Sequence, residues 1–173
     1  MRHELLFIPA IVVSAPALAD EYLTLQQAQA QIFPGQTLTD SHFVLDDGQI
    51  SALVKQTGAP IARRQVRVWK VSDGGWFFLD HVIVRGDRIV YAVGLDARGA
   101  VQGIEILACL PLYDGIRQPA WRTQFIGKDH GKAQSLDHIK SVSGSTLSSN
   151  NITLGVKRML ATHALFLSSG TPG

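Results

Sequence analysis

Apolar residues in the middle of the chain occur in short runs rich in β-branched and aromatic side chains, which is the pattern of strands. Four strands are expected, at Val66, Val68 and Val71 and at residues 76–84, 89–95 and 101–107. Short segments rich in glycine, aspartate and arginine separate them, at 73–75, 85–87 and 96–99. Such segments are typical of turns between antiparallel neighbours. The pattern therefore predicts an antiparallel meander of about four strands.

Outside this region, apolar residues recur three and four positions apart, which predicts helices. The apolar stripe of a first, short helix over residues 23–33 consists of Leu25, Ala28 and Ile32. A second helix is expected at 47–57, where a strand is its rival, and two more are expected at 119–125 and 150–164. Because a sheet must bury at least one face, we predict an α+β fold in which N-terminal and C-terminal helices cover the antiparallel sheet.

The length of 173 residues and the hydrophobic content of 46% suit one domain with a buried core. Residues 1–19 have the features of a cleavable secretory signal, with Arg2 in a short basic segment, an apolar stretch at 5–13 and small residues before the expected cleavage site. An uncleaved anchor or a buried hairpin is the alternative. We expect residues 20–173 to form a single domain that is exported to the periplasm.

The charge pattern does not indicate nucleic-acid binding, because the formal net charge is only +2 and the basic residues are spread along the chain. The exception is the cluster of Arg63, Arg64 and Arg67. We interpret it as a solvated entrance to a strand, and a docking patch for an acidic partner is the alternative. The one cysteine, Cys109, lies in an apolar run and is interpreted as a buried small hydrophobe, with a reactive thiol as the alternative.

The segment 143–149 combines very small residues with hydroxyls directly before a helical pattern. Free backbone N–H groups at a helix N-terminus attract phosphate, and glycine lets the chain approach a ligand closely. A phosphorylated ligand can therefore bind at Ser143-Gly144-Ser145-Thr146, and the Thr146 oxygen can be esterified by it.

This segment resembles the flavinylation motif of the FMN-binding domain family, which includes periplasmic flavoprotein subunits of the sodium-pumping NADH:quinone oxidoreductase and of Rnf-type complexes. The family pattern is Ser-Gly-Ala-Thr-x-Ser/Thr-Ser, and here only Ser145 departs from it, in place of alanine. The resemblance extends over 119–128 and 152–160, with looser strand patterning back to about Phe77.

The resemblance implies that Thr146 carries FMN through a phosphodiester. It implies that the cofactor site also includes Ser143, Gly144, Ser145, Leu147 and Ser148. A separate flavin transferase would install FMN from FAD, and the product would exchange electrons with redox partner proteins, including membrane-bound ones. The protein would then be an electron carrier and have no substrate of its own.

Other interpretations stay open for the same residues. Thr146 can be a helix N-cap, although we expect Ser148 or Ser149 to take that role and to leave Thr146 upstream of the helix. Trp121 and Tyr113 are the best candidates for a wall against the isoalloxazine ring, and either can instead belong to the core. For Arg122 and Lys128, a role near the phosphate or the reduced flavin competes with that of solvated surface charges. Trp76 and Phe77 are weaker candidates for the wall.

A non-redox exported module that binds a phosphate-bearing ligand reversibly is the alternative function. It is favoured by Lys140, which stands where the family usually has an acidic residue, and the nearest carboxylate is Asp137. Metal, haem and hydrolase chemistry have no support, because no zinc or haem spacing and no serine-hydrolase motif occurs in the sequence.

Overall fold

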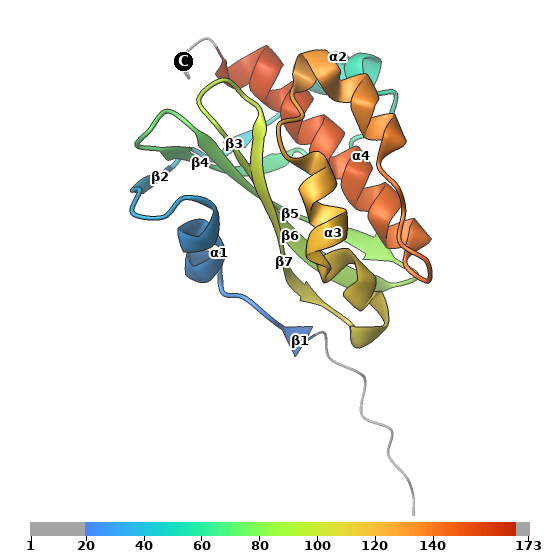
Figure 1. Ribbon diagram of the computed structural model, residues 1–173. Helices are drawn as coiled ribbons and strands as arrows, with labels where there is room; N and C mark the ends of the chain where they lie inside the picture. Colours follow the sequence, from blue (N-terminus) through green and yellow to red (C-terminus); the bar gives the residue numbers. More distant parts are fainter. Residues whose placement is uncertain (1–19, 169–173) are drawn as a thin grey trace, which may run out of the picture.

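The computed structural model describes residues 20–168, except for the side chains of residue 20 and residues 132–135. Figure 1 shows a sheet that crosses the molecule, with helices on both of its faces. The expected signal at 1–19 lies outside the described residues. The strands are β1 (Asp20–Glu21), β2 (Leu38–Asp40), β3 (Phe43–Val44), β4 (Gln65–Val71), β5 (Trp76–Val84), β6 (Asp87–Leu95) and β7 (Val101–Cys109). The α-helices are α1 (Leu25–Ile32), α2 (Asp47–Thr57), α3 (Pro119–Arg122) and α4 (Thr146–Thr162).

Three 3₁₀ segments, η1 (Pro111–Arg117), η2 (Thr123–Phe125) and η3 (His130–His138), connect the sheet to α4, and the π-helical turn η4 (His163–Leu167) follows it. None of the helices formed by residues 20–168 is long and apolar enough to cross a membrane.

The predicted four-stranded meander is confirmed, because β4, β5, β6 and β7 pair antiparallel in chain order. The sheet also contains three short strands at its edges, in the order β1-β7-β6-β5-β4-β2, with β3 beside β4. Each of these has only two or three residues, which is too short to show a hydrophobic period in the sequence.

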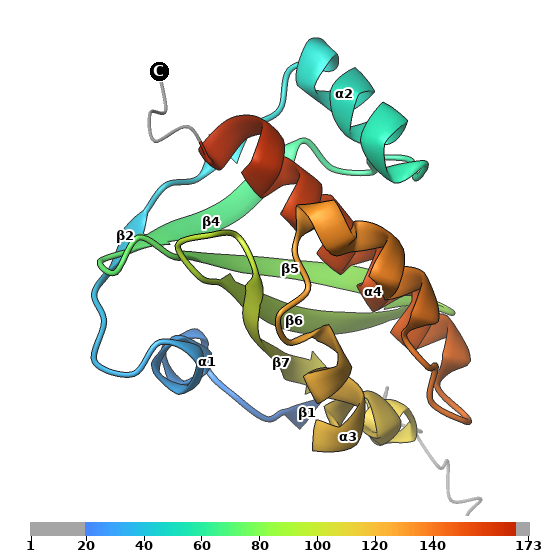
Figure 2. The same cartoon turned by 45° about the horizontal axis from the view of Figure 1, so that its top comes forward.

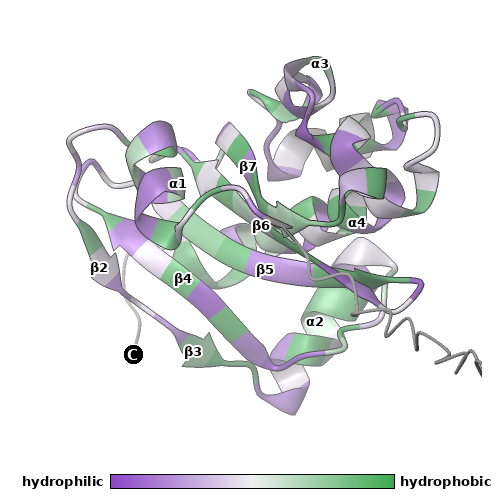
Figure 3. Ribbon diagram, turned by 90° about the horizontal axis from the view of Figure 1, so that it is seen from below, coloured by the Kyte–Doolittle hydropathy of each residue, from purple (hydrophilic) through white to green (hydrophobic). Residues whose placement is uncertain are grey.

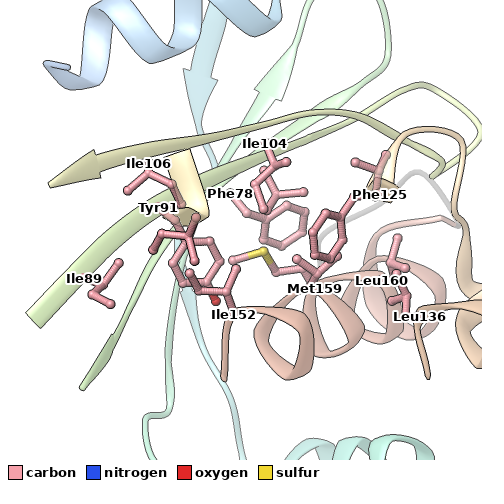
Figure 4. Close-up of a cluster of buried hydrophobic side chains, with 14 of the residues drawn as sticks. Phe78, Ile89, Tyr91, Ile104, Ile106, Phe125, Leu136, Ile152, Met159 and Leu160 are labelled. Carbon is pink, nitrogen blue, oxygen red and sulfur yellow. The ribbon is translucent and has the colours of Figure 1, made fainter. Parts of the chain in front are cut away.

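Helices cover both faces of the sheet. One face packs against α4, with α2 and α3 beside it, and the other face packs against α1 (Figure 2). The larger core lies on the α4 side, where Phe78 and Tyr91 from the strands meet Ile152 and Met159 from the helix (Figure 4). Cys109 belongs to the same core and is fully buried, as its apolar neighbours in the sequence predict.

The second predicted helix is confirmed, because α2 spans Asp47–Thr57 and no strand forms there. Asp46 and Gln49 explain the choice. The Asp46 side chain accepts a hydrogen bond from the Gln49 backbone, and the Gln49 side chain accepts one from the Asp46 backbone. Such a reciprocal cap satisfies two backbone donors that a strand would have to pair elsewhere.

Acidification is expected to destabilise the fold through His163, which is only 6% exposed. Burial lowers the pKa of His163 below its ordinary value of 6.5, against a weaker opposite effect of Asp96. The unfolded chain then binds the proton more readily, so the stability is complete above about pH 6.5 and is lost as the pH falls through the lower folded value.

The free energy of unfolding in urea should therefore decrease from about pH 7.5 to about pH 5.5. His163→Asn should flatten this dependence, and the matched change at the exposed His138 should leave it in place. A slope that is unchanged in His163→Asn would refute the assignment. Part of the slope should remain in that variant, because the pKa of His81 is lowered as well, mainly by burial.

Candidate functional site

The motif Ser143-Gly144-Ser145-Thr146 forms a tight turn that leads directly into α4. The Ser145 N–H donates to the Val142 carbonyl at 3.0 Å, which closes a four-residue β-turn. Gly144 is the third residue of this turn and has a φ of 78°. A side chain is strained at this φ, so the turn itself requires glycine at this position, in addition to the close approach of a ligand that glycine permits.

The helix begins earlier than the sequence predicts. Ser145 is its N-cap residue and Thr146 its first residue, so the expectation that Ser148 or Ser149 caps the helix is wrong. Both serines lie inside the first turn, where their hydroxyls donate to the Ser145 carbonyl at 3.2 and 2.8 Å. Their hydroxyls are satisfied locally, and this lets serines sit within a helix instead of before it.

The Thr146 side chain is exposed to solvent. Its hydroxyl has one weak contact, a donation to the Val142 carbonyl at 3.5 Å, which is the upper limit for a hydrogen bond. The oxygen that the sequence selects as the attachment point is therefore accessible, on a helix whose backbone is fixed.

The other motif residues divide into two groups. Ser143 and Gly144 are exposed, and Leu147 is 51% exposed. The Ser145 and Ser148 side chains are buried, at 4% and 1% exposure. A ligand at this turn can meet the exposed group directly. Ser148 can contribute only through its backbone N–H, and the Ser145 N–H is already bonded to the Val142 carbonyl.

The backbone N–H groups at the start of α4 form the electrostatic part of the site. The first N–H groups of any helix have no partner within it, and Ser145 provides no side-chain cap. The positive end of the helix dipole therefore points at the exposed Thr146. Phosphate is the group that such an end accommodates best.

The 3₁₀ segment η1 packs against the turn. A Cβ on Gly115 would lie 2.4 Å from Val142 Cγ1, so the η1 backbone packs directly on the first residue of the turn. Tyr113 in turn shares its one hydroxyl proton between Asp87 Oδ2, at 2.8 Å, and the more distant Val84 carbonyl, at 3.2 Å. The turn at residues 142–145, η1 and the β5–β6 hairpin therefore form one connected end of the molecule.

Sequence reasoning missed this support, because Gly115 and Val142 are far apart in the chain and no local pattern joins them. Burial, and then the hydrogen bond to Asp87, raise the pKa of Tyr113, so its hydroxyl stays protonated as the donor that the support requires.

The two aromatic residues named from the sequence lie in the core. Tyr113 is 4% exposed and Trp121 is 2% exposed, and Trp121 makes an edge-on contact with Phe125. The Trp121 Nε1 is buried and has no hydrogen-bond partner among the described residues. In this conformation both ring faces are covered, and the stacking role of Trp121 and Tyr113 stays a prediction. Trp76 and Phe77 are core residues as well.

Several charged residues near the motif are already engaged elsewhere. Arg122 pairs with Glu105 and donates to the carbonyls of Ile104 and Arg117. Asp137 pairs with Lys157, about three turns along α4 from Thr146, so it does not take the place of the missing acid near the motif. Within the described part of the chain, no cluster of His, Cys, Asp or Glu can hold a metal ion.

Comparison with known families gives one match, to the model of the FMN-binding domain over residues 85–161. The matched span runs from the β5–β6 hairpin to the last turn of α4 and contains the whole motif. No curated protein and no solved structure matches the chain. The match supports FMN binding, and with it a flavoprotein.

Proposed function

Because residues 85–161 match the FMN-binding domain family, we propose that this protein is an exported electron carrier whose FMN is joined to Thr146 by a phosphodiester. Residues 1–19 serve as its cleavable export signal, and the mature protein works in the periplasm. The observation that carries the proposal is the exposed Thr146 hydroxyl at the first position of α4, inside the matched span.

The residues present fit the group. The uncapped N-terminus of α4 presents backbone N–H donors to a phosphate, and no atom lies within 4 Å of a Cβ placed on Gly144, so the turn is open on that side. Ser143, Gly144 and Leu147 would border the phosphate and the start of the flavin chain. When bound, FMN supplies the capacity to accept and donate one or two electrons.

Attachment is a transfer to this protein, catalysed by a separate flavin transferase. The Thr146 oxygen forms a bond to the flavin-side phosphorus of FAD, the phosphoanhydride bond breaks, and AMP leaves with the bond electrons. The hydroxyl proton passes to the transferase, whose magnesium ion offsets the charge on the phosphates. The chain itself contributes only the exposed oxygen and the donors at the helix end.

The test is to co-express the full chain with a flavin transferase, denature it and look for yellow-green fluorescence of its band under ultraviolet light. We expect a fluorescent band. We also expect the intact mass to equal that of residues 20–173 plus one FMN residue. A dark band at the mass of the bare polypeptide would refute covalent attachment. The alternative function would then apply, a non-redox module that binds a phosphate-bearing ligand reversibly. Lys140, in place of an acidic residue, favours this alternative.

A further inference from the structure

Among residues 20–168, α1 covers only part of the sheet face on which it packs. The helix packs at the end near Gly94, where a Cβ would collide with its last residues. Farther along, the antiparallel pairs His81–Val90 and Ile83–Arg88 lie on the same face, because residues two apart in a strand point the same way. Ile83 is 53% exposed there. Figure 3 shows this side of the molecule, with α1 over one part of the sheet and β4 and β5 running beyond it.

We call this bare region the open face and define it by five residues, Arg67, His81, Ile83, Arg88 and Val90. Arg67 belongs to it because it stands opposite Leu79, two residues before His81 on β5. Arg67 and Arg88 are exposed, and Val90 is half-buried. The open face therefore has an apolar centre, Ile83 and Val90, between two arginines.

Positive charge is concentrated around His81. Arg63, in the loop before β4, donates Nη1 to His81 Nε2 at 2.8 Å. Burial, followed by the charges of Arg63, Arg88 and Arg67, lowers the pKa of His81, while Asp80 acts in the opposite direction. Burial first, and the surrounding arginines second, favour the neutral form of the imidazole.

The arginines of the open face lack compensating acids. Asp80 is bound by Arg63, at 2.5 Å, and by Arg158 of α4. The ion pairs formed within the described residues include neither Arg67 nor Arg88. In a chain whose net charge is only +2, this is a local concentration of unpaired positive charge.

We propose that the open face binds an acidic surface of a partner protein, whose carboxylates pair with Arg67 and Arg88 while apolar groups contact Ile83 and Val90. An apolar centre with a charged rim is the usual composition of a protein interface, and complementary charge guides the encounter. The inference rests on the proposed function in one respect, that the partner is the electron donor or acceptor.

The position of the open face suits such a partner. Ile83 and Arg88 adjoin Val84 and Asp87, which accept the hydrogen bonds of Tyr113, and η1 then packs on the turn at residues 142–145. The open face and α4 lie on opposite faces of the sheet, so a protein docked on the open face would approach the segment that holds Thr146 around the β5–β6 end.

Other occupants fit less well. In a two-fold dimer the same face meets itself, which would place arginines against arginines. A membrane-binding patch commonly contains about four to eight basic residues, more than the open face offers.

The test uses the full chain and a synthetic peptide of about ten glutamates, with binding measured by titration calorimetry at low and high salt. We expect salt-sensitive binding that weakens by about tenfold or more in the double variant Arg67→Glu/Arg88→Glu. Arg98→Glu is the control for the single variants Arg67→Glu and Arg88→Glu, because it changes the net charge by the same amount and Arg98 is 90% exposed on the turn between β6 and β7. That variant should bind the peptide as the wild type does.

The proposal would be overturned if the double variant and Arg98→Glu lost the same amount of affinity for the peptide. It would also be overturned if the wild type did not bind the peptide at low salt. Tighter binding to vesicles that contain an anionic phospholipid than to the peptide would make a membrane the occupant and overturn it too. So would a dimer in sedimentation that the double variant abolishes. The titration needs no flavin, so Thr146→Ala should bind the peptide as the wild type does. A failure of peptide binding can therefore be distinguished from a failure of flavin attachment.

Discussion

Thr146→Ala is expected to abolish the flavin fluorescence of the denatured band completely, because it removes the only oxygen to which the phosphate is proposed to be joined. The fold should be unaffected. The side chain is exposed, and its one hydrogen bond is at the limit of length, so the free energy of unfolding should change by less than about 0.5 kcal/mol. Gel fluorescence and intact mass after co-expression with a flavin transferase provide the measurement.

Two matched variants make this result specific. Thr146→Ser keeps a hydroxyl at the same position and should retain fluorescence. Ser143→Ala removes another exposed hydroxyl from the same turn and should also retain it. Loss of the band in Ser143→Ala, with retention in Thr146→Ala, would move the attachment point and contradict the assignment.

Gly155→Ala is expected to be the most destabilising single-methyl change in α4. A Cβ at this position would lie 1.8 Å from the Tyr91 hydroxyl oxygen and 3.0 Å from its Cζ. Tyr91 is fully buried in the sheet, so it has no free space into which to move. Overpacking of this kind should cost about 3 kcal/mol, measured as the free energy of unfolding in urea.

A double variant separates the steric cause from any other. Tyr91→Phe removes the colliding oxygen and gives up only its long contact with Asp80, at 3.5 Å, so it should cost about 1 kcal/mol. In Tyr91→Phe/Gly155→Ala, much of the Gly155→Ala penalty should disappear, because the closest collision is gone. Additive costs would contradict the steric explanation. Gly48→Ala in α2 is the control, since Gly48 is exposed and its added methyl meets only Asp46 Oδ1, at 3.3 Å.

The strands of the meander and the two helices α1 and α2 follow from the sequence, because their signals are local periods and caps. The start of α4 does not. Ser145, Ser148 and Ser149 are all plausible caps by residue type, and no local pattern in the sequence distinguishes among them. The short edge strands escape sequence analysis for a related reason, since they exist only through their pairing with β4 and β7.

The sequence motif selects Thr146 as the candidate residue, but it does not reveal the surroundings of that residue. The motif itself identifies Thr146, and the structure places that side chain at the surface. Tyr113 and Trp121 were interpreted from the sequence as residues of loop-like segments near a cofactor, but tertiary packing buries both rings. Likewise, Arg122 looks free in the sequence, whereas in the fold it pairs with Glu105 across the sheet edge.

Thr146 and Gly155 lie on one unbroken helix, so the packing of α4 on the sheet and the exposure of the motif are properties of a single element. If Thr146 carries the flavin as proposed, we expect a substitution that lifts α4 from the sheet at Gly155 to disturb the end that a transferase has to recognise. The yield of flavinylated protein would then report how well the helix is seated, even for variants whose changes lie far from the motif.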